Sequence, residues 1–190
     1  MIFSPFRRNR RPDTISALYG TIVAQARLPC FYRDYGVADT VNGRFDLLVL
    51  HLVLVLERLV GEAALTERSQ ALFDRFCRDM DDNLREIGIA DLKVPKEMRR
   101  IGEAFYGRAQ AYRTALAAEG DDALAAAVAR NVYSGAPPDP AAPRRLAAYM
   151  RVALRELRAQ QADAIAAGDL RWPDPVASLS NAHEDPQARV

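Results

Sequence analysis

The sequence has few residues that could form a disulfide framework or a metal site. It holds two cysteines, Cys30 and Cys77, with no Cys-x-x-Cys spacing, and two histidines, His51 and His183. A disulfide-stapled fold needs more cysteines, and a closed zinc site needs four nitrogen or sulfur ligands. A chain of 190 residues can also bury enough apolar surface to fold without cross-links. We therefore expect one ordinary folded domain without a disulfide scaffold, a metal or a cofactor.

The chain also has little net charge, because 26 basic residues face 25 acidic ones. A net charge of +1 excludes a protein whose whole surface binds polyanions, and we expect no DNA partner. The basic residues are concentrated at one end, where Arg7, Arg8, Arg10 and Arg11 follow a short apolar stretch. A secretory signal has the opposite order, so we expect the protein to stay where it is made. Residues 1–12 are either a disordered basic arm or a contact with anionic lipid or RNA.

Sequence motifs of the common enzyme classes are missing. The chain has no nucleophile-elbow, P-loop, zinc-protease or dinucleotide-binding motif. Carboxylates do gather at Asp79, Asp81, Asp82 and Glu86, but arginines are interleaved with them and no Glu-x-x-His unit is present. Such a pattern is typical of a solvated helix face. The sequence therefore predicts a protein that is not an enzyme.

Apolar residues recur with helical spacing almost throughout the chain, and no long stretch alternates with the period of a strand. The pattern predicts an all-α, single-domain bundle of six main helices. Glycine follows five of them. We place the domain at residues 13–168 and an irregular tail at 169–190, with Trp172 as its strong anchor. The helices are expected at about residues 15–26, 44–60, 67–87, 94–120, 121–134 and 143–168.

One segment is hydrophobic on every side. Between Asp46 and Glu57 lie ten positions that are apolar except for His51. A membrane span needs about 20 apolar residues, so this segment is too short to cross a bilayer. A helix that is apolar all round is a buried central helix. We expect His51 to be a core residue with satisfied nitrogens, the alternative being a role in a binding pocket.

Two aromatic regions could offer apolar surface to a partner. The connection at 30–43 is rich in aromatic residues, and the helix at 94–120 carries Phe105 and Tyr106 between Gly102 and Gly107. Glycine inside a helix costs nearly 1 kcal/mol relative to alanine. These glycines predict either close packing of another helix within the domain or a concavity beside the rings.

Several segments taken together resemble the ubiquinol–cytochrome c chaperone family. They are LYGTIVAQAR at 18–27, NGRFDLLVLH at 42–51, AFYGRAQAY at 104–112, and the run from Leu72 to Leu92 with its LFD, DMD and LREIG pieces. The resemblance covers about residues 15–117 and is looser beyond. Ala38 and Ala90 stand where many relatives have proline and glycine, and Arg99-Arg100 replaces a lysine pair.

The resemblance implies an assembly chaperone that binds newly made cytochrome b for the bc1 complex. Mitochondrial members act with a small partner protein near the ribosome. The family-like region begins within about 15 residues of Met1, so we expect a bacterial-type member in the cytoplasm. The arm (Arg7, Arg8, Arg10 and Arg11) would then allow peripheral contact with the inner membrane.

From the family motif positions and residue chemistry, we expect a client-binding surface made of aromatic residues with a polar rim. The aromatic residues are Phe31, Tyr32, Tyr35, Phe45, Phe105 and Tyr106. The rim residues are Arg44, Asp46, Asp81, Arg85 and Arg108.

An RNA- or ribosome-binding translation factor is the main alternative. Its basic surface would comprise the arm and two arginine-bearing helices, with Arg99, Arg100, Arg108 and Arg113 on one and Arg144, Arg145, Arg151, Arg155 and Arg158 on the other. Glu97, Glu103 and Glu156 dilute this charge. A small metal-dependent hydrolase is a third, weaker alternative.

Overall fold

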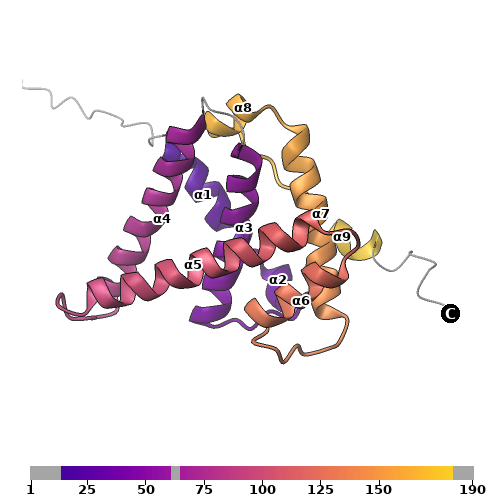
Figure 1. Cartoon of the computed structure of the whole chain (residues 1–190), viewed down its shortest axis with the longest axis horizontal. Coiled ribbons are helices and arrows are strands. Elements are labelled where there is room, and N and C mark those ends of the chain that lie inside the picture. The colour runs from indigo at the N-terminus through magenta and orange to yellow at the C-terminus, as the bar shows by residue number, and fades with distance from the viewer. Residues whose placement is uncertain (1–13, 61–64, 182–190) are drawn as a thin grey trace, which may run out of the picture.

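The computed structural model describes residues 14–60 and 65–181, and in these residues it contains helices and no strand (Figure 1). The helices are α1 (Thr14–Ala26), α2 (Pro29–Arg33), α3 (Val41–Leu59), α4 (Thr66–Glu86), α5 (Val94–Ala117), α6 (Asp122–Asn131), α7 (Ala142–Ala159), α8 (Ala162–Ala166) and α9 (Pro175–Asn181). Six of them have ten or more residues, which confirms the all-α prediction of six main helices. The predicted arm at 1–12 lies outside the described residues.

Helix α3 is the centre of the bundle. It contacts α1, α4, α5 and α7, and every residue from Asp46 to Val55 is buried. Figure 1 shows α5 running across the molecule from the α4 side to the α7 side. Helix α6 packs against α5 and α7, and α8 packs against α1. The prediction of a buried central helix from its all-round apolar sequence is confirmed.

His51 lies in this core and links three helices through a chain of hydrogen bonds. Gln25 Nε2 on α1 donates to the hydroxyl of Tyr149 on α7 over 3.0 Å. The Tyr149 hydroxyl then donates to His51 Nε2 over 2.9 Å, and His51 Nδ1 donates to the Leu47 carbonyl over 2.8 Å. We assign the ring proton to Nδ1 because only this tautomer satisfies all of these groups. His51 is therefore a satisfied core residue.

The last long helix is shorter than its apolar pattern predicts. We expected one helix from 143 to 168, but α7 ends at Ala159 and α8 begins at Ala162. Arg58 donates to the carbonyls of Leu157 and Gln160. The Gln160 side chain in turn donates to the Arg171 carbonyl and accepts from the Arg171 N–H. These contacts replace the hydrogen bonds that would have continued the helix.

The segment after α8 is held against the core rather than hanging from it. The half-buried Trp172 ring meets His51 edge-on, with centroids 5.1 Å apart. Tyr35 donates from its hydroxyl to the Pro175 carbonyl over 2.7 Å. Helix α9 follows and packs against α7 and α2, where the sequence had predicted irregular chain. The expected anchor at Trp172 is present.

Gly43 in the first turn of α3 allows a close approach of the preceding loop. Its N–H donates to the Thr40 side chain, which caps the helix. A Cβ atom at this position would lie 2.0 Å from the Ala38 carbonyl oxygen. Gly20 in α1, by contrast, has nothing within 4 Å of where its Cβ would be.

We predict opposite effects of alanine at these two glycines. Gly43→Ala should lower the free energy of unfolding by about 2 kcal/mol, because the loop must move away from the new methyl group. Gly20→Ala should raise it by up to about 1 kcal/mol, because alanine is the better helix former and nothing obstructs it. Urea unfolding followed by circular dichroism measures both. A shift of the same sign in both variants would contradict the close approach at Gly43.

A second prediction concerns pH. Burial lowers the pKa of His51 to about 4, below its ordinary value near 6.5. Between these values the unfolded chain binds a proton that the folded one excludes. The contribution of His51 to stability should thus be complete above pH 6.5 and be lost, by up to about 3 kcal/mol, as the pH drops through 4.

The control is His51→Gln, which is neutral at every pH and can still accept the Tyr149 hydrogen bond. This variant should lose less stability than the parent between pH 6.5 and 4, whatever its stability at pH 7. Equal losses in thermal melts across this range would show that His51 is not the titrating group.

Candidate functional site

The predicted client-binding residues do not form one surface. Phe31 and Tyr35 lie in the core, whereas Tyr32 and Arg44 line a hollow near α2. Asp81 and Arg85 lie near the end of the α4–α5 hairpin. The other five lie where α3, α4 and α5 pack together: Phe45, Asp46, Phe105, Tyr106 and Arg108.

Phe31 and Tyr35 correct the prediction of an exposed aromatic loop. Both have no exposed surface. The expected connection contains α2, and the Phe31 ring packs edge-on against Tyr149, with centroids 5.0 Å apart. These residues anchor the core and cannot contact a partner in this fold. Aromatic content alone does not distinguish a packed segment from a docking surface.

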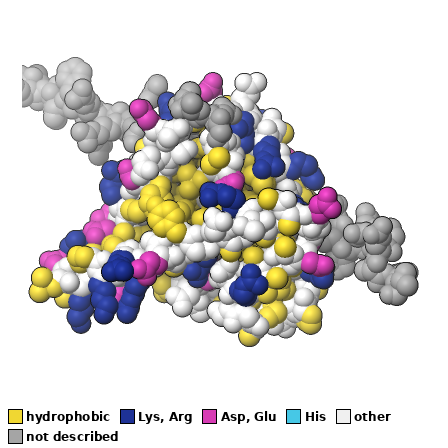
Figure 2. All heavy atoms as spheres, in the orientation of Figure 1, with side chains coloured by type: hydrophobic (Ala, Val, Ile, Leu, Met, Phe, Trp, Pro, Cys, Tyr) yellow, Lys and Arg dark blue, Asp and Glu magenta, His cyan; other side chains and the backbone are white. Residues whose placement is uncertain are grey.

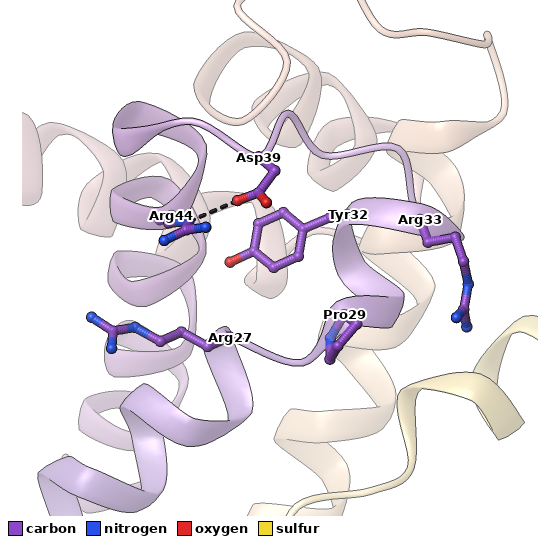
Figure 3. Close-up of a pocket in the computed structure, with 6 residues that line it drawn as sticks. All are labelled: Arg27, Pro29, Tyr32, Arg33, Asp39 and Arg44. Carbon is purple, nitrogen blue, oxygen red and sulfur yellow. Dashed lines mark hydrogen bonds and ion pairs between the residues drawn. The ribbon is translucent and has the colours of Figure 1, made fainter.

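Tyr32 and Arg44 line a hollow with Arg27, Pro29, Arg33 and Asp39 (Figure 3). Arg44 Nε donates to Asp39 Oδ1 over 2.7 Å, and the Tyr32 hydroxyl donates to the Ala26 carbonyl. Figure 3 shows Arg27, Arg44 and the Tyr32 hydroxyl on one side, with Arg33 pointing away. The sequence prediction missed Arg27, because nothing in its spacing relates the end of α1 to Arg44.

Asp81 and Arg85 lie near the end of α4. Arg85 donates from Nε to Asp81 Oδ2 over 2.7 Å, and it also pairs with Asp91 in the connection to α5. Arg85 is nine residues beyond Phe76, or about 13 Å along the helix. The pair therefore fixes the turn between α4 and α5 rather than bordering the aromatic residues.

Three of the remaining predicted residues, Phe45, Phe105 and Tyr106, belong to what we call the α4–α5 aromatic face. It consists of Phe45 on α3, Phe73 on α4 and Tyr106 on α5, with Phe76 and Phe105 beneath. Ring centroids lie 4.9 Å apart for Phe73–Phe105 and 5.7 Å for Phe73–Tyr106. Figure 2 shows a hydrophobic patch in the angle between α4 and α5, with charged side chains at its edge.

Exposure differs sharply within this face. Phe105 is 3% exposed, so the expectation that it contacts a client directly is wrong, and its role is to support the rings above it. Tyr106 is 63% exposed, and Phe45 and Phe73 are half-buried. Phe73 is not among the residues predicted for the client surface, because its helical spacing matches the buried stripe of α4.

The glycines beside Tyr106 leave space. A Cβ atom at Gly102 or Gly107 would have nothing within 4 Å. Of the two interpretations of these glycines, close packing against another helix of the domain is therefore wrong. The backbone of α5 is therefore open at both glycines.

A buried ion pair joins this face to the core. Arg108 Nη2 lies 2.7 Å from Asp46 Oδ1, and the guanidinium carbon lies 5.5 Å from the Phe45 ring centroid. The Asp46 side chain is 7% exposed. Burial raises the pKa of Asp46 to about 6, although the Arg108 charge acts in the opposite direction. The carboxylate is thus poised to accept a proton just below neutral pH.

In residues 14–60 and 65–181, no three His, Cys, Asp or Glu side chains are grouped so that they could hold a metal ion. None of the helices in the same residues combines the length and hydropathy needed to cross a membrane. What the described chain does offer is a small apolar surface with one ion pair at its edge.

Known proteins resemble this chain in both sequence and structure. The structure is similar to one described as the crystal structure of the Cbp3 homolog from Brucella abortus, with a TM-score of 0.77 and 41% sequence identity. The match covers 86% of this chain and 90% of the other. A search of curated proteins returned no match. The family model for ubiquinol–cytochrome c chaperones matches residues 33–172, from α2 to Trp172. The chain therefore belongs to the ubiquinol–cytochrome c chaperone family.

Proposed function

We propose that this protein is a non-catalytic assembly chaperone of the ubiquinol–cytochrome c reductase complex that binds newly made cytochrome b. The family membership supports the assembly role. The observation that supports client binding is the α4–α5 aromatic face, where Tyr106 stands 63% exposed over packed rings. An aromatic residue on a rigid support is the type of group that dominates protein–protein contacts. The similarity to the Brucella abortus structure supports a bacterial-type member, which we place in the cytoplasm.

The face suits an apolar client segment before it enters the membrane. Phe45, Phe73 and Tyr106 offer ring surface, and the open positions at Gly102 and Gly107 let a client backbone approach α5. Arg108 at the edge, 23% exposed on its side chain, can meet a carbonyl or carboxylate of the client. Binding of this kind needs no chemical step and leaves the client unchanged on release.

The RNA-binding alternative is less well supported by the arginines. Most of those on α5 and α7 pair with carboxylates: Arg99 with Glu103, Arg100 with Glu97, Arg108 with Asp46, Arg113 with Glu57, Arg144 with Asp122, Arg145 with Asp139 and Arg151 with Asp121. Paired cations attract phosphates weakly, because the neighbouring anion cancels much of their field. A ribosome contact and a small partner protein stay predictions from the family resemblance.

We predict that Tyr106→Ser weakens client binding without unfolding the protein. The ring is exposed, so its loss removes contact area for the client but leaves the core intact. Photo-crosslinking from a probe at Ala104 or Gln110 to nascent cytochrome b should fall by about tenfold or more. The level of assembled ubiquinol–cytochrome c reductase should fall with it.

Val176→Ser on α9 is the matched control, since Val176 is 48% exposed and lies on another helix. This variant should crosslink and assemble as the parent does. Full crosslinking by a folded Tyr106→Ser protein would rule out the aromatic face as the client surface.

A further inference from the structure

The connection between α4 and α5 carries apolar side chains that the described chain does not cover. Ile87 is 71% exposed and Leu92 is 96% exposed. Single exposed apolar residues are ordinary. Two bulky aliphatic residues in one short connection, at the end of a projecting hairpin, are a different case (Figure 1). We call residues 87–100 the hairpin tip.

The turn that presents them is held in place. Gly88 adopts a φ of +84°, and its N–H donates to the Arg85 carbonyl, while Ile89 N–H donates to the Leu84 carbonyl. Arg85 pairs with Asp81 on α4 and with Asp91 in the turn. The apolar side chains are therefore displayed by a fixed backbone, which lowers the entropy cost of docking.

Basic side chains surround the tip. Lys93, Lys96, Arg99 and Arg100 are all exposed, and their spacing places them on one side of the first two turns of α5. Arg99 and Arg100 pair with Glu103 and Glu97, whereas no ion pair within the described residues involves either lysine. Figure 2 shows dark blue side chains grouped along the lower edge of this projection and hydrophobic ones at its extremity.

This arrangement fits the surface of an anionic bilayer. Aliphatic groups enter the boundary between headgroups and acyl chains, while unpaired lysines stay at headgroup level and contact phosphate. From Arg85 to Arg100 the chain has five basic and three acidic residues, and Asp91 and Glu97 are already paired with arginines. The exposed surface of the tip is consequently cationic around an apolar apex. No aromatic residue, the usual anchor of a protein contact, lies in this segment.

We propose that the hairpin tip docks the protein on an anionic lipid surface, with Ile87 and Leu92 entering the interface and Lys93 and Lys96 contacting lipid phosphates. This surface is separate from the aromatic face and does not depend on cytochrome b. It also differs from the arm at 1–12, for which membrane contact is one of the alternatives that the sequence leaves open.

Co-sedimentation of the full chain with vesicles tests the proposal. Vesicles of phosphatidylcholine with phosphatidylglycerol should bind the parent protein at low salt, and phosphatidylcholine alone should bind it much less. The double variant Ile87→Ser/Leu92→Ser should bind the anionic vesicles about tenfold more weakly. Lys93→Gln/Lys96→Gln should weaken binding and reduce its salt dependence. Val176→Ser, which exchanges an exposed apolar residue elsewhere, should bind as the parent does.

A variant with Arg7, Arg8, Arg10 and Arg11 replaced by serine separates the arm from the tip. Binding that survives in this variant and is lost on adding the tip changes supports the proposal. Full binding by the tip variants, or binding that depends on the arm alone, overturns it.

Lysine labelling gives an independent readout, because Lys93 and Lys96 are the only lysines in the chain. Anionic vesicles should protect both amines from acetylation, and neutral vesicles should not. Unchanged labelling with anionic vesicles would overturn the proposal. Protection by cytochrome b but not by vesicles would overturn it as well, and would make the tip a protein interface. Because neither vesicle experiment contains a client, failure here leaves the proposed client binding untouched.

Discussion

The burial of α3 is the constraint on which the rest of the structure depends. A helix enclosed on all sides can hold polar side chains only where neighbouring helices supply partners. Asp46 meets Arg108 on α5, His51 meets Tyr149 on α7, and Glu57 meets Arg113 on α5. Two ion pairs with α5, eleven residues apart on α3, fix how α5 crosses the central helix. Phe45, which precedes Asp46, is thereby held beside Arg108 and against Phe76.

This arrangement buries the Asp46 carboxylate next to the apolar surface. Burying a carboxylate is expensive, and the attraction of one guanidinium offsets only part of that cost, as the raised pKa of Asp46 indicates. Such a pair adds little net stability over an apolar substitute, but separating it is costly. The Asp46–Arg108 pair is therefore better understood as fixing the position of the aromatic face than as strengthening the fold. Protonation near pH 6 would loosen that fixation without removing the apolar contacts.

The sequence predicted what depends on periodicity and missed what depends on long-range contacts. The all-round apolar run at 47–56 predicted a buried central helix, and a core position was the expected one for the histidine within it. The break after α7 could not be foreseen, because it depends on Arg58, about 100 residues earlier in the chain. Phe31 and Tyr35 were misplaced for a related reason: the surfaces that cover them come from α7 and from Pro175. Tyr106 directly follows Phe105 and therefore faces a different side of α5. The spacing of α5 predicts this outward position once Phe105, Ala109 and Tyr112 are taken as the inner side of the helix.

Most of the aromatic face lies on α4 and α5, the two helices that the hairpin tip connects. Their positions affect how a client is held. Three partly exposed rings form a small surface, well below the roughly 800 Å² per partner of a stable interface. Binding through this face alone would be weak, which suits a client that must be released into the membrane. Docking through the tip would confine the protein to the surface where the client inserts, and so raise the effective concentration of the face. Weak contact combined with confinement gives capture and release without a chemical step, since neither contact has to be strong by itself. In that arrangement the rigid turn held by Arg85 matters as much as the rings, because it fixes the distance between the lipid surface and the face.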